Sequence, residues 1–249
     1  MNELVNDHFK VVDPEAHITY DGHTYLVFGE KDTEFKQEHE DLRPESKQLH
    51  HINFYTMRRF VELIDEIKEP LIVETGTSAT LVKSSHLFDK YIFSKGGDFI
   101  TVDINPGAAH HLSKDILCPK TKAITADSVH LLKNLDKLTL KKIDALYLDS
   151  WDVEYLNPMD AANHCKNELI AALPYLNDYC IILIDDTPKS PLYLPWRSDM
   201  NTQISTLYEI TGMMPGKGML YEDVLKDCPF DYKIEMHQHQ LLLILNRKK

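Results

Sequence analysis

Residues 71–80, LIVETGTSAT, join a short apolar run to a glycine-containing turn that opens into a helix candidate at residues 80–93. Similar apolar runs recur along the chain, and amphipathic stretches separate them. The later runs are FITVD (99–103), AITAD (123–127), IDALYLD (143–149) and CIILIDD (180–186), with helix candidates at 107–117, 128–136 and 160–174. Short, nearly continuous apolar strands that alternate with helices indicate a parallel sheet covered on both faces.

The flanking segments complete this architecture. Residues 52–67, INFYTMRRFVELIDEI, have the apolar spacing of a helix that ends before Pro70. Residues 231–246, DYKIEMHQHQLLLILN, leave no room for a helix between two strands, which predicts an antiparallel pair at the sheet edge. We therefore expect residues 51–249 to form an α/β, Rossmann-like, doubly wound sheet of seven strands, mostly parallel with an antiparallel C-terminal strand.

The first 50 residues have a different pattern. Residues 16–28, AHITYDGHTYLVF, alternate around Asp21-Gly22, a dipeptide that favours a tight hairpin turn. Residues 30–48 are a charged run, which is typical of a solvated loop or face. We therefore predict a small N-terminal hairpin and charged extension at 1–50, followed by a single domain at 51–249.

The composition limits the class of protein. The 249 residues carry 27 Lys+Arg against 39 Asp+Glu, a net charge of −12, which argues against a nucleic-acid partner. No apolar run reaches the roughly 18–20 residues that span a bilayer, and the polar N-terminus does not resemble a targeting peptide. We expect a cytoplasmic protein, compatible with a homo-oligomer, with reduced thiols at four scattered cysteines: Cys118, Cys165, Cys180 and Cys228.

Each of the five predicted inner strands ends in an acidic residue: Glu74, Asp103, Asp127, Asp149 and Asp186. In a doubly wound sheet, ligands bind outside the carboxyl ends of the strands. Five carboxylates that converge on this edge therefore predict a ligand site.

The turn after the first strand suggests a nucleotide-like ligand. Gly76 and the small residues Thr77 and Ser78 would let the backbone approach a ligand closely, while Glu74 favours a positively charged group. The GxGxxG fingerprint of dinucleotide sites is absent, which argues against the interpretation as a nicotinamide-dependent oxidoreductase. Asp103 stands where an acid holds both hydroxyls of a ribose, and Asp127-Ser128 could reach an adenine amino group.

The motifs ETGTSAT, VDIN, ADS and YLDSWD, in this order and spacing, resemble the class I S-adenosylmethionine-dependent methyltransferases over roughly residues 50–249. The resemblance implies that Glu74 and Gly76 lie by the methionine part of the cofactor, Asp103 by the ribose and Asp127 with Ser128 by the adenine. Thr80 replaces the later glycine of the family's first loop. Asp149 and Trp151 are further candidates for contact with the cofactor.

A second constellation lies after the fourth and fifth strands. Asp149 and Asp185-Asp186 would meet there, and three adjacent carboxylates repel one another unless a cation or protons neutralise them. Carboxylate oxygens are the ligands that Mg²⁺ and similar divalent cations prefer. The pattern resembles the cation-dependent O-methyltransferases of the catechol and macrocin types, which implies a metal at these three residues. Asp152 stands where the catechol type has its basic lysine.

Other residues are candidates for the remaining roles. Asp149 or His164 could act as the base, and Trp196 and Arg197 could belong to a lid within residues 187–220. His237 and His239 alternate as on an exposed strand face, without an evident third metal ligand.

The leading interpretation is a divalent-metal-assisted O-methylation of a small hydroxylated molecule by S-adenosylmethionine. The alternatives are a metal-independent N- or C-methyltransferase of the same fold, and a nucleotide-binding protein without catalysis.

Overall fold

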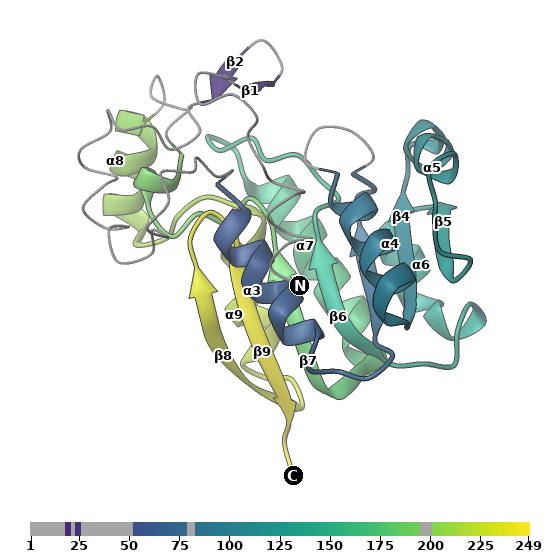
Figure 1. The fold of residues 1–249 in the computed structure, drawn as a ribbon. Coiled ribbons are helices and arrows are strands. Elements are labelled where there is room, and N and C mark those ends of the chain that lie inside the picture. Colours follow the sequence, from purple (N-terminus) through teal and green to yellow (C-terminus); the bar gives the residue numbers. More distant parts are fainter. Residues whose placement is uncertain (1–17, 21–22, 26–51, 79–82, 195–200) are drawn as a thin grey trace, which may run out of the picture.

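A computed structural model describes residues 18–20, 23–25, 52–78, 83–194 and 201–249 of the chain. Its main feature within those residues is a seven-stranded sheet, ordered β5-β4-β3-β6-β7-β9-β8 (Figure 1). The strands are β3 (Leu71–Thr75), β4 (Asp98–Asp103), β5 (Thr121–Thr125), β6 (Ile143–Leu148), β7 (Leu176–Ile184), β8 (Phe230–His237) and β9 (Leu241–Arg247). Strands β3 to β7 pair in parallel, whereas β9 is antiparallel to both of its neighbours. The predicted fold class is confirmed.

Helices cover both faces of this sheet. One face packs on α3 (Phe54–Ile64) and α4 (Ser84–Lys95), and the other on α6 (Ser128–Lys133), α7 (Met159–Ala172) and α9 (Tyr221–Leu225). Figure 1 shows α3 and α7 on opposite sides of the strands. The remaining described helices are α5 (Pro106–Ser113), α8 (Asn201–Thr211) and the 3-10 turns η2 (Leu135–Lys137), η3 (Leu173–Tyr175), η4 (Pro191–Tyr193) and η6 (Lys217–Leu220).

Alternation along the strands creates the two cores. Leu71 and Val73 of β3 face α6 and α7, while Ile72 between them faces α3 and α4. All five residues of β3 are buried, because both faces of a parallel sheet are covered. Burial of each such Leu, Ile or Val side chain contributes about 1.5–3 kcal/mol, so packing holds the carboxyl ends of the strands in place.

The C-terminal hairpin places residues at the same edge. Strand β9 inserts between β7 and β8, with Leu241 opposite Ile184 at the end of β7. Residues 238–240, which connect β8 to β9, therefore lie beside the turn that follows β7. The antiparallel pair was predicted, and its position brings His239 and Gln240 next to Asp185 and Asp186.

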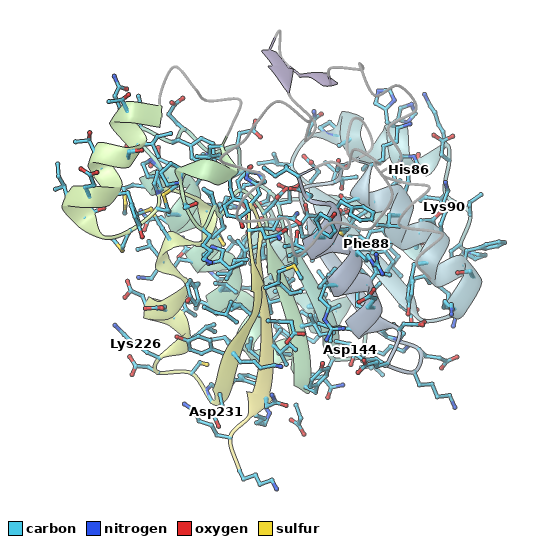
Figure 2. The ribbon with its side chains drawn as sticks, turned by 60° about the vertical axis from the view of Figure 1, so that its left-hand side comes forward. His86, Phe88, Lys90, Asp144, Lys226 and Asp231 are labelled. Atoms are coloured by element: carbon cyan, nitrogen blue, oxygen red, sulfur yellow. The ribbon has the colours of Figure 1, made fainter. Side chains whose placement is uncertain are left out.

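The opposite end of the sheet is distant from this edge. Asp144 and Asp231, near the starts of β6 and β8, lie toward the other end of the strands in Figure 2. The Asp144 carboxylate accepts hydrogen bonds from the Leu71 backbone and the Asn177 side chain, so its role is structural.

At the N-terminus, β1 (Ile18–Tyr20) and β2 (His23–Tyr25) pair antiparallel, as the predicted hairpin requires. The Asp21-Gly22 turn and the charged run at 30–48 fall outside the described residues. The four cysteines are buried and none forms a disulfide. Within the described part of the chain, every helix is too short or too polar to traverse a bilayer.

Candidate active site

Acidic residues gather at the carboxyl ends of the parallel strands, as predicted. Asp103 is the last residue of β4, Asp149 follows β6 directly, and Asp185-Asp186 follow β7. Because β6 and β7 are neighbours, Asp149, Asp185 and Asp186 form one group, which we call the acidic cluster. The buried Tyr147 hydroxyl lies between two of them, 2.9 Å from Asp185 Oδ2 and 3.3 Å from Asp149 Oδ2.

A lysine that sequence reasoning did not identify enters the acidic cluster. The Lys217 Nζ lies 2.5 Å from Asp149 Oδ1 and 3.2 Å from Asp186 Oδ2, and its side chain is only 3% exposed. The negative charges of Asp149 and Asp186 outweigh burial and hold the pKa of Lys217 well above its usual value. Burial opposes ionisation of Asp186, but Lys217 and His239 together outweigh it and lower the pKa of that carboxyl. Lys217 is therefore a charged ammonium between two carboxylates.

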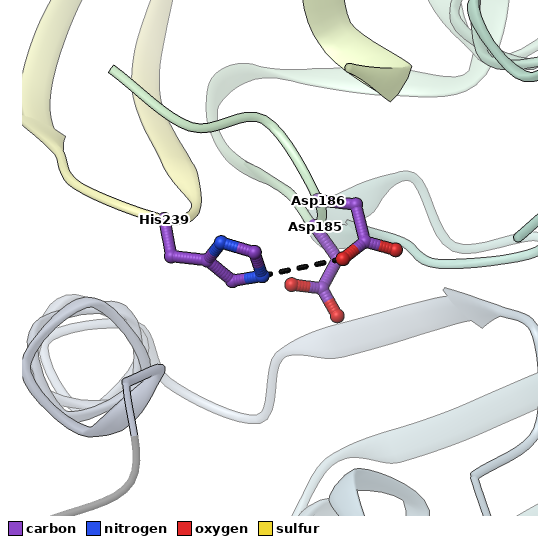
Figure 3. Close-up of side chains that lie close together, drawn as sticks. All are labelled: Asp185, Asp186 and His239. Carbon is purple, nitrogen blue, oxygen red and sulfur yellow. Dashed lines mark hydrogen bonds and ion pairs between the residues drawn. The ribbon is translucent and has the colours of Figure 1, made fainter. Parts of the chain in front are cut away.

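His239 also contacts the acidic cluster, at Asp186 (Figure 3). Its Nε2 lies 3.2 Å from Asp186 Oδ1, and its Nδ1 lies 3.1 Å from the Tyr193 carbonyl oxygen. Both ring nitrogens thus lie within hydrogen-bond distance of oxygen atoms. The prediction that His237 and His239 share an exposed strand face is wrong, since β8 ends at His237 and His239 is buried in the connection to β9.

Neutral donors surround Asp185. Its Oδ1 accepts from Gln240 Nε2 at 2.9 Å and from Asn53 Nδ2 at 3.3 Å, and its Oδ2 accepts from Tyr147. Hydrogen bonds of this kind stabilise a buried carboxylate without a counterion in contact.

Gly76 makes a close backbone contact that the sequence did not predict. Its φ is +82°, and a Cβ there would lie 2.2 Å from the Asp149 carbonyl oxygen. The first loop therefore requires glycine here for its close approach to the backbone after β6, and the contact of Gly76 with a ligand stays a prediction. The next residue, Thr77, donates its backbone N–H to Asp103 Oδ2 at 3.0 Å.

Glu74 faces inward. It is fully buried, and its carboxylate accepts hydrogen bonds from the hydroxyls of Ser84, Ser85 and Thr101. Burial raises the pKa of Glu74 to about 7, against the opposing effect of these hydroxyls. Its contacts tie β3 to β4 and α4, so the structure gives this side chain a supporting place beneath the first loop.

Asp103 lies at the open edge and is half-buried. It accepts backbone N–H groups from Thr77 on Oδ2, and from Asn105 on Oδ1 at 2.7 Å. Two carboxylate oxygens have about four acceptor positions, so the group can still accept hydroxyl donors from a ligand.

A polar and aromatic group is formed by residues that follow β5 and β6 and by one residue of α7. Ser128 Oγ is 3.0 Å from His164 Nε2, and the exposed Trp151 ring lies over the His164 ring with centroids 5.0 Å apart. His164 also pairs with the buried Glu168 at 3.4 Å, and its hydrogen bond to this carboxylate raises the pKa of His164. Asp127 caps α6 through His130 N. His164 is thus oriented toward Ser128 and Glu168 rather than toward the acidic cluster.

Comparison with known proteins shows the fold. No protein-family model and no curated protein sequence matches this chain. The O-methyltransferase TomG from Streptomyces achromogenes, in complex with S-adenosylmethionine, superposes with a TM-score of 0.52 at 14% identity, over 90% of this chain and 92% of that chain. The methyltransferase PaMTH1 from Podospora anserina gives 0.52 at 14% identity over 87% of each chain. This chain has the fold of the S-adenosylmethionine-dependent methyltransferases.

Within this methyltransferase fold, the predicted metal site at Asp149, Asp185 and Asp186 does not fit a divalent ion as it is arranged. The Lys217 ammonium occupies the position between Asp149 and Asp186. The described group with metal-ligand spacing, its candidate atoms within 4.8 Å of one another, contains Asp185, Asp186 and His239 and leaves Asp149 out. Both oxygens of Asp185 and both oxygens of Asp186 already accept hydrogen bonds from protein donors.

Some predicted residues stay untested by this geometry. Ser78 follows Thr77 in the first loop and is half-buried. Thr80, Trp196 and Arg197 fall outside the described residues. The segment 187–220, predicted as a lid, contributes Lys217 to the acidic cluster.

Proposed function

We propose that this protein is an S-adenosylmethionine-dependent methyltransferase that methylates a hydroxyl group of a small molecule. The observation that carries the proposal is the position of the Asp149–Lys217 pair, at the edge of the sheet where doubly wound folds bind ligands. A carboxylate and an ammonium in contact, partly open to solvent, can accept a proton from a hydroxyl and stabilise the oxygen that loses it.

We propose the following places for the cofactor among the described residues. Asp103 would accept the ribose hydroxyls, and the exposed Trp151 ring offers a surface for the adenine near Ser128 and Asp127. Thr77 and Ser78 would line the methionine part, with Glu74 and Gly76 supporting the loop from behind. When bound, S-adenosylmethionine supplies a methyl group that an acceptor oxygen takes with its own electron pair, while the electron pair of the broken C–S bond stays on sulfur.

We assign to Asp149 the role of accepting the proton of the acceptor hydroxyl. Its side chain is 21% exposed, so an acceptor can reach it. Tyr147 has one hydroxyl proton and lies nearer to Asp185, which leaves Asp149 Oδ2 available for the acceptor. Burial, followed by the charge of Asp185, raises the pKa of Asp149, and this makes the carboxylate a better proton acceptor. His164 would position Trp151 and is not required for proton transfer.

Ligand titration and turnover test the proposal separately. Calorimetry should show S-adenosylmethionine binding to the full chain, and production of S-adenosylhomocysteine should depend on a small polyhydroxylated acceptor. Asp149→Asn should lose most turnover and keep cofactor binding, whereas the exposed Asp152→Asn should keep both. Absence of cofactor binding would refute the proposal, and binding without turnover on any acceptor would favour a non-catalytic nucleotide-binding protein.

The surroundings of the reaction are also part of the proposal. Four buried thiols without disulfides agree with a reducing compartment such as the cytoplasm. We propose a small-molecule acceptor because the net charge of −12 opposes the binding of nucleic acid.

The rival mechanism, in which Mg²⁺ or another divalent cation binds Asp149, Asp185 and Asp186, requires Lys217 to leave its position between Asp149 and Asp186.

A further inference from the structure

We infer that Lys217 is a built-in replacement for a divalent cation, so that this centre works without metal. The inference concerns the charge in the acidic cluster. Its consequence for catalysis rests on the proposed methyl transfer. Three carboxylates on two adjacent strand ends require a positive charge, and a side chain of the same chain supplies it.

The backbone holds Lys217 in place. Lys217 lies between Gly216 and Gly218 at the start of η6, and its N–H donates to the Asp186 carbonyl oxygen at 3.0 Å. The Gly218 N–H donates to Thr187 Oγ1 at 2.9 Å. Two consecutive residues of one short segment are thus fixed to the turn that follows β7.

The two glycines make this contact possible. A Cβ at Gly216 would lie 2.5 Å from the Asp186 carbonyl oxygen, and a Cβ at Gly218 would lie 2.7 Å from Thr187 Cγ2. Neither position accepts a side chain without displacement of its neighbours. The Gly-Lys-Gly sequence therefore brings the backbone close enough for the lysine to reach both carboxylates while buried.

The rest of the cluster is satisfied once Lys217 is present. Asp186 contacts Lys217 on Oδ2 and His239 on Oδ1, and Asp185 is held by Tyr147, Gln240 and Asn53. Asp186 itself has a left-handed backbone, with φ at +42°, which ends β7 in a tight turn beneath η6. A divalent ion would have to displace both the ammonium and several hydrogen bonds.

The inference predicts that removal of the ammonium creates a metal site. In Lys217→Ala, three carboxylates would face a space without a counterion, and such a set binds hard divalent cations. Lys217→Arg keeps the positive charge and should not gain a site. Lys226→Ala, on the exposed Lys226–Asp223 pair, is the control for loss of any lysine.

The probe is Mn²⁺, measured by the loss of its free electron paramagnetic resonance signal as it binds. Wild type, Lys217→Arg and Lys226→Ala should not bind one Mn²⁺ per chain at a specific site. Lys217→Ala should bind one Mn²⁺ per chain, with an affinity at least about ten-fold higher than that of any Mn²⁺ binding by the wild type. The double variant Lys217→Ala/Asp149→Asn should lose most of this gain.

If the wild type bound one Mn²⁺ and Asp186→Asn abolished that binding, the inference would be overturned. This test does not depend on whether the lysine variants fold. Equal Mn²⁺ affinity in a folded Lys217→Ala and the wild type would overturn it as well. Calorimetry with S-adenosylmethionine on the same samples reports on the proposed function independently, because cofactor binding and Mn²⁺ binding are separate readouts. In turnover assays, wild-type activity should be unchanged by a chelator.

Discussion

Glu74 gives the protein a pH dependence that can be calculated from its environment. Its pKa is about 7 in the folded chain, against an ordinary value of 4.5, because the carboxyl is buried beneath the first loop. The folded state therefore binds the proton more tightly than the unfolded chain does. The stability associated with this group is fully present below pH 4.5 and is lost as the pH rises through 7. The full difference corresponds to about 3 kcal/mol, of which about 2.5 kcal/mol falls between pH 5 and pH 8.

Urea unfolding of wild type and Glu74→Gln at pH 5 and pH 8 measures this effect. The amide keeps the side-chain length and hydrogen-bonding capacity toward Ser84, Ser85 and Thr101 but cannot ionise. The free energy of unfolding of the variant, relative to wild type, should rise by about 2.5 kcal/mol between the two pH values. The exposed Glu154→Gln should show no such change. A relative stability of Glu74→Gln that is the same at both pH values would refute the assigned burial of a neutral Glu74.

Three further variants test the site. Gly76→Ala should lower the free energy of unfolding, measured with urea, by at least about 2 kcal/mol, because of its positive φ and the contact with Asp149. Gly212→Ala has a positive φ but open space around it, so it should lower the free energy of unfolding by only about 1 kcal/mol. Asp103→Ala should weaken S-adenosylmethionine binding by about 2–3 kcal/mol in calorimetry, and Asp98→Ala at the other end of β4 should leave it unchanged. Trp151→Ala should weaken cofactor binding by about 1–2 kcal/mol without a loss of turnover at saturation, and unchanged affinity would remove it from the cofactor site.

The sheet was predictable because its strands depend on a local property. Continuous apolar runs such as Cys180–Ile184 have to be buried on both faces, and the helices between them have to lie on those faces. The meeting of Asp149 with Asp185-Asp186 followed from strand adjacency in the same way. What the sequence showed was that a cation or protons have to neutralise the carboxylates at this edge of the sheet.

The source of that charge was not predictable from the sequence. Lys217 comes from a four-residue 3-10 turn, and its contact with Asp149 spans 68 residues. Its position depends on backbone hydrogen bonds to the turn after β7, which no periodicity encodes. His239 was misassigned for a related reason, because the alternation of His237 and His239 continues a strand pattern beyond the point where β8 ends.

Glu74 and Gly76 show a second limit of reasoning from strand ends. The motif located the first loop correctly, but the direction of each residue depends on neighbours that are remote in sequence. Glu74 contacts hydroxyls from α4 and β4, and Gly76 contacts the backbone after β6. Residues that look like ligand contacts in the sequence can therefore also support the backbone of the first loop.

The insertion of β9 between β7 and β8 also has a consequence for the order in which the protein matures on the ribosome. Synthesis runs from the N-terminus, so β7 is made long before residues 241–247 exist to pair with it. Until then β7 keeps an apolar, unpaired edge, which is a hazard for association with other nascent chains. The Gln240 and His239 side chains reach the carboxylates only when this last strand docks. A chain in which residues 241–247 have not yet paired with β7 would therefore also have an incomplete acidic cluster.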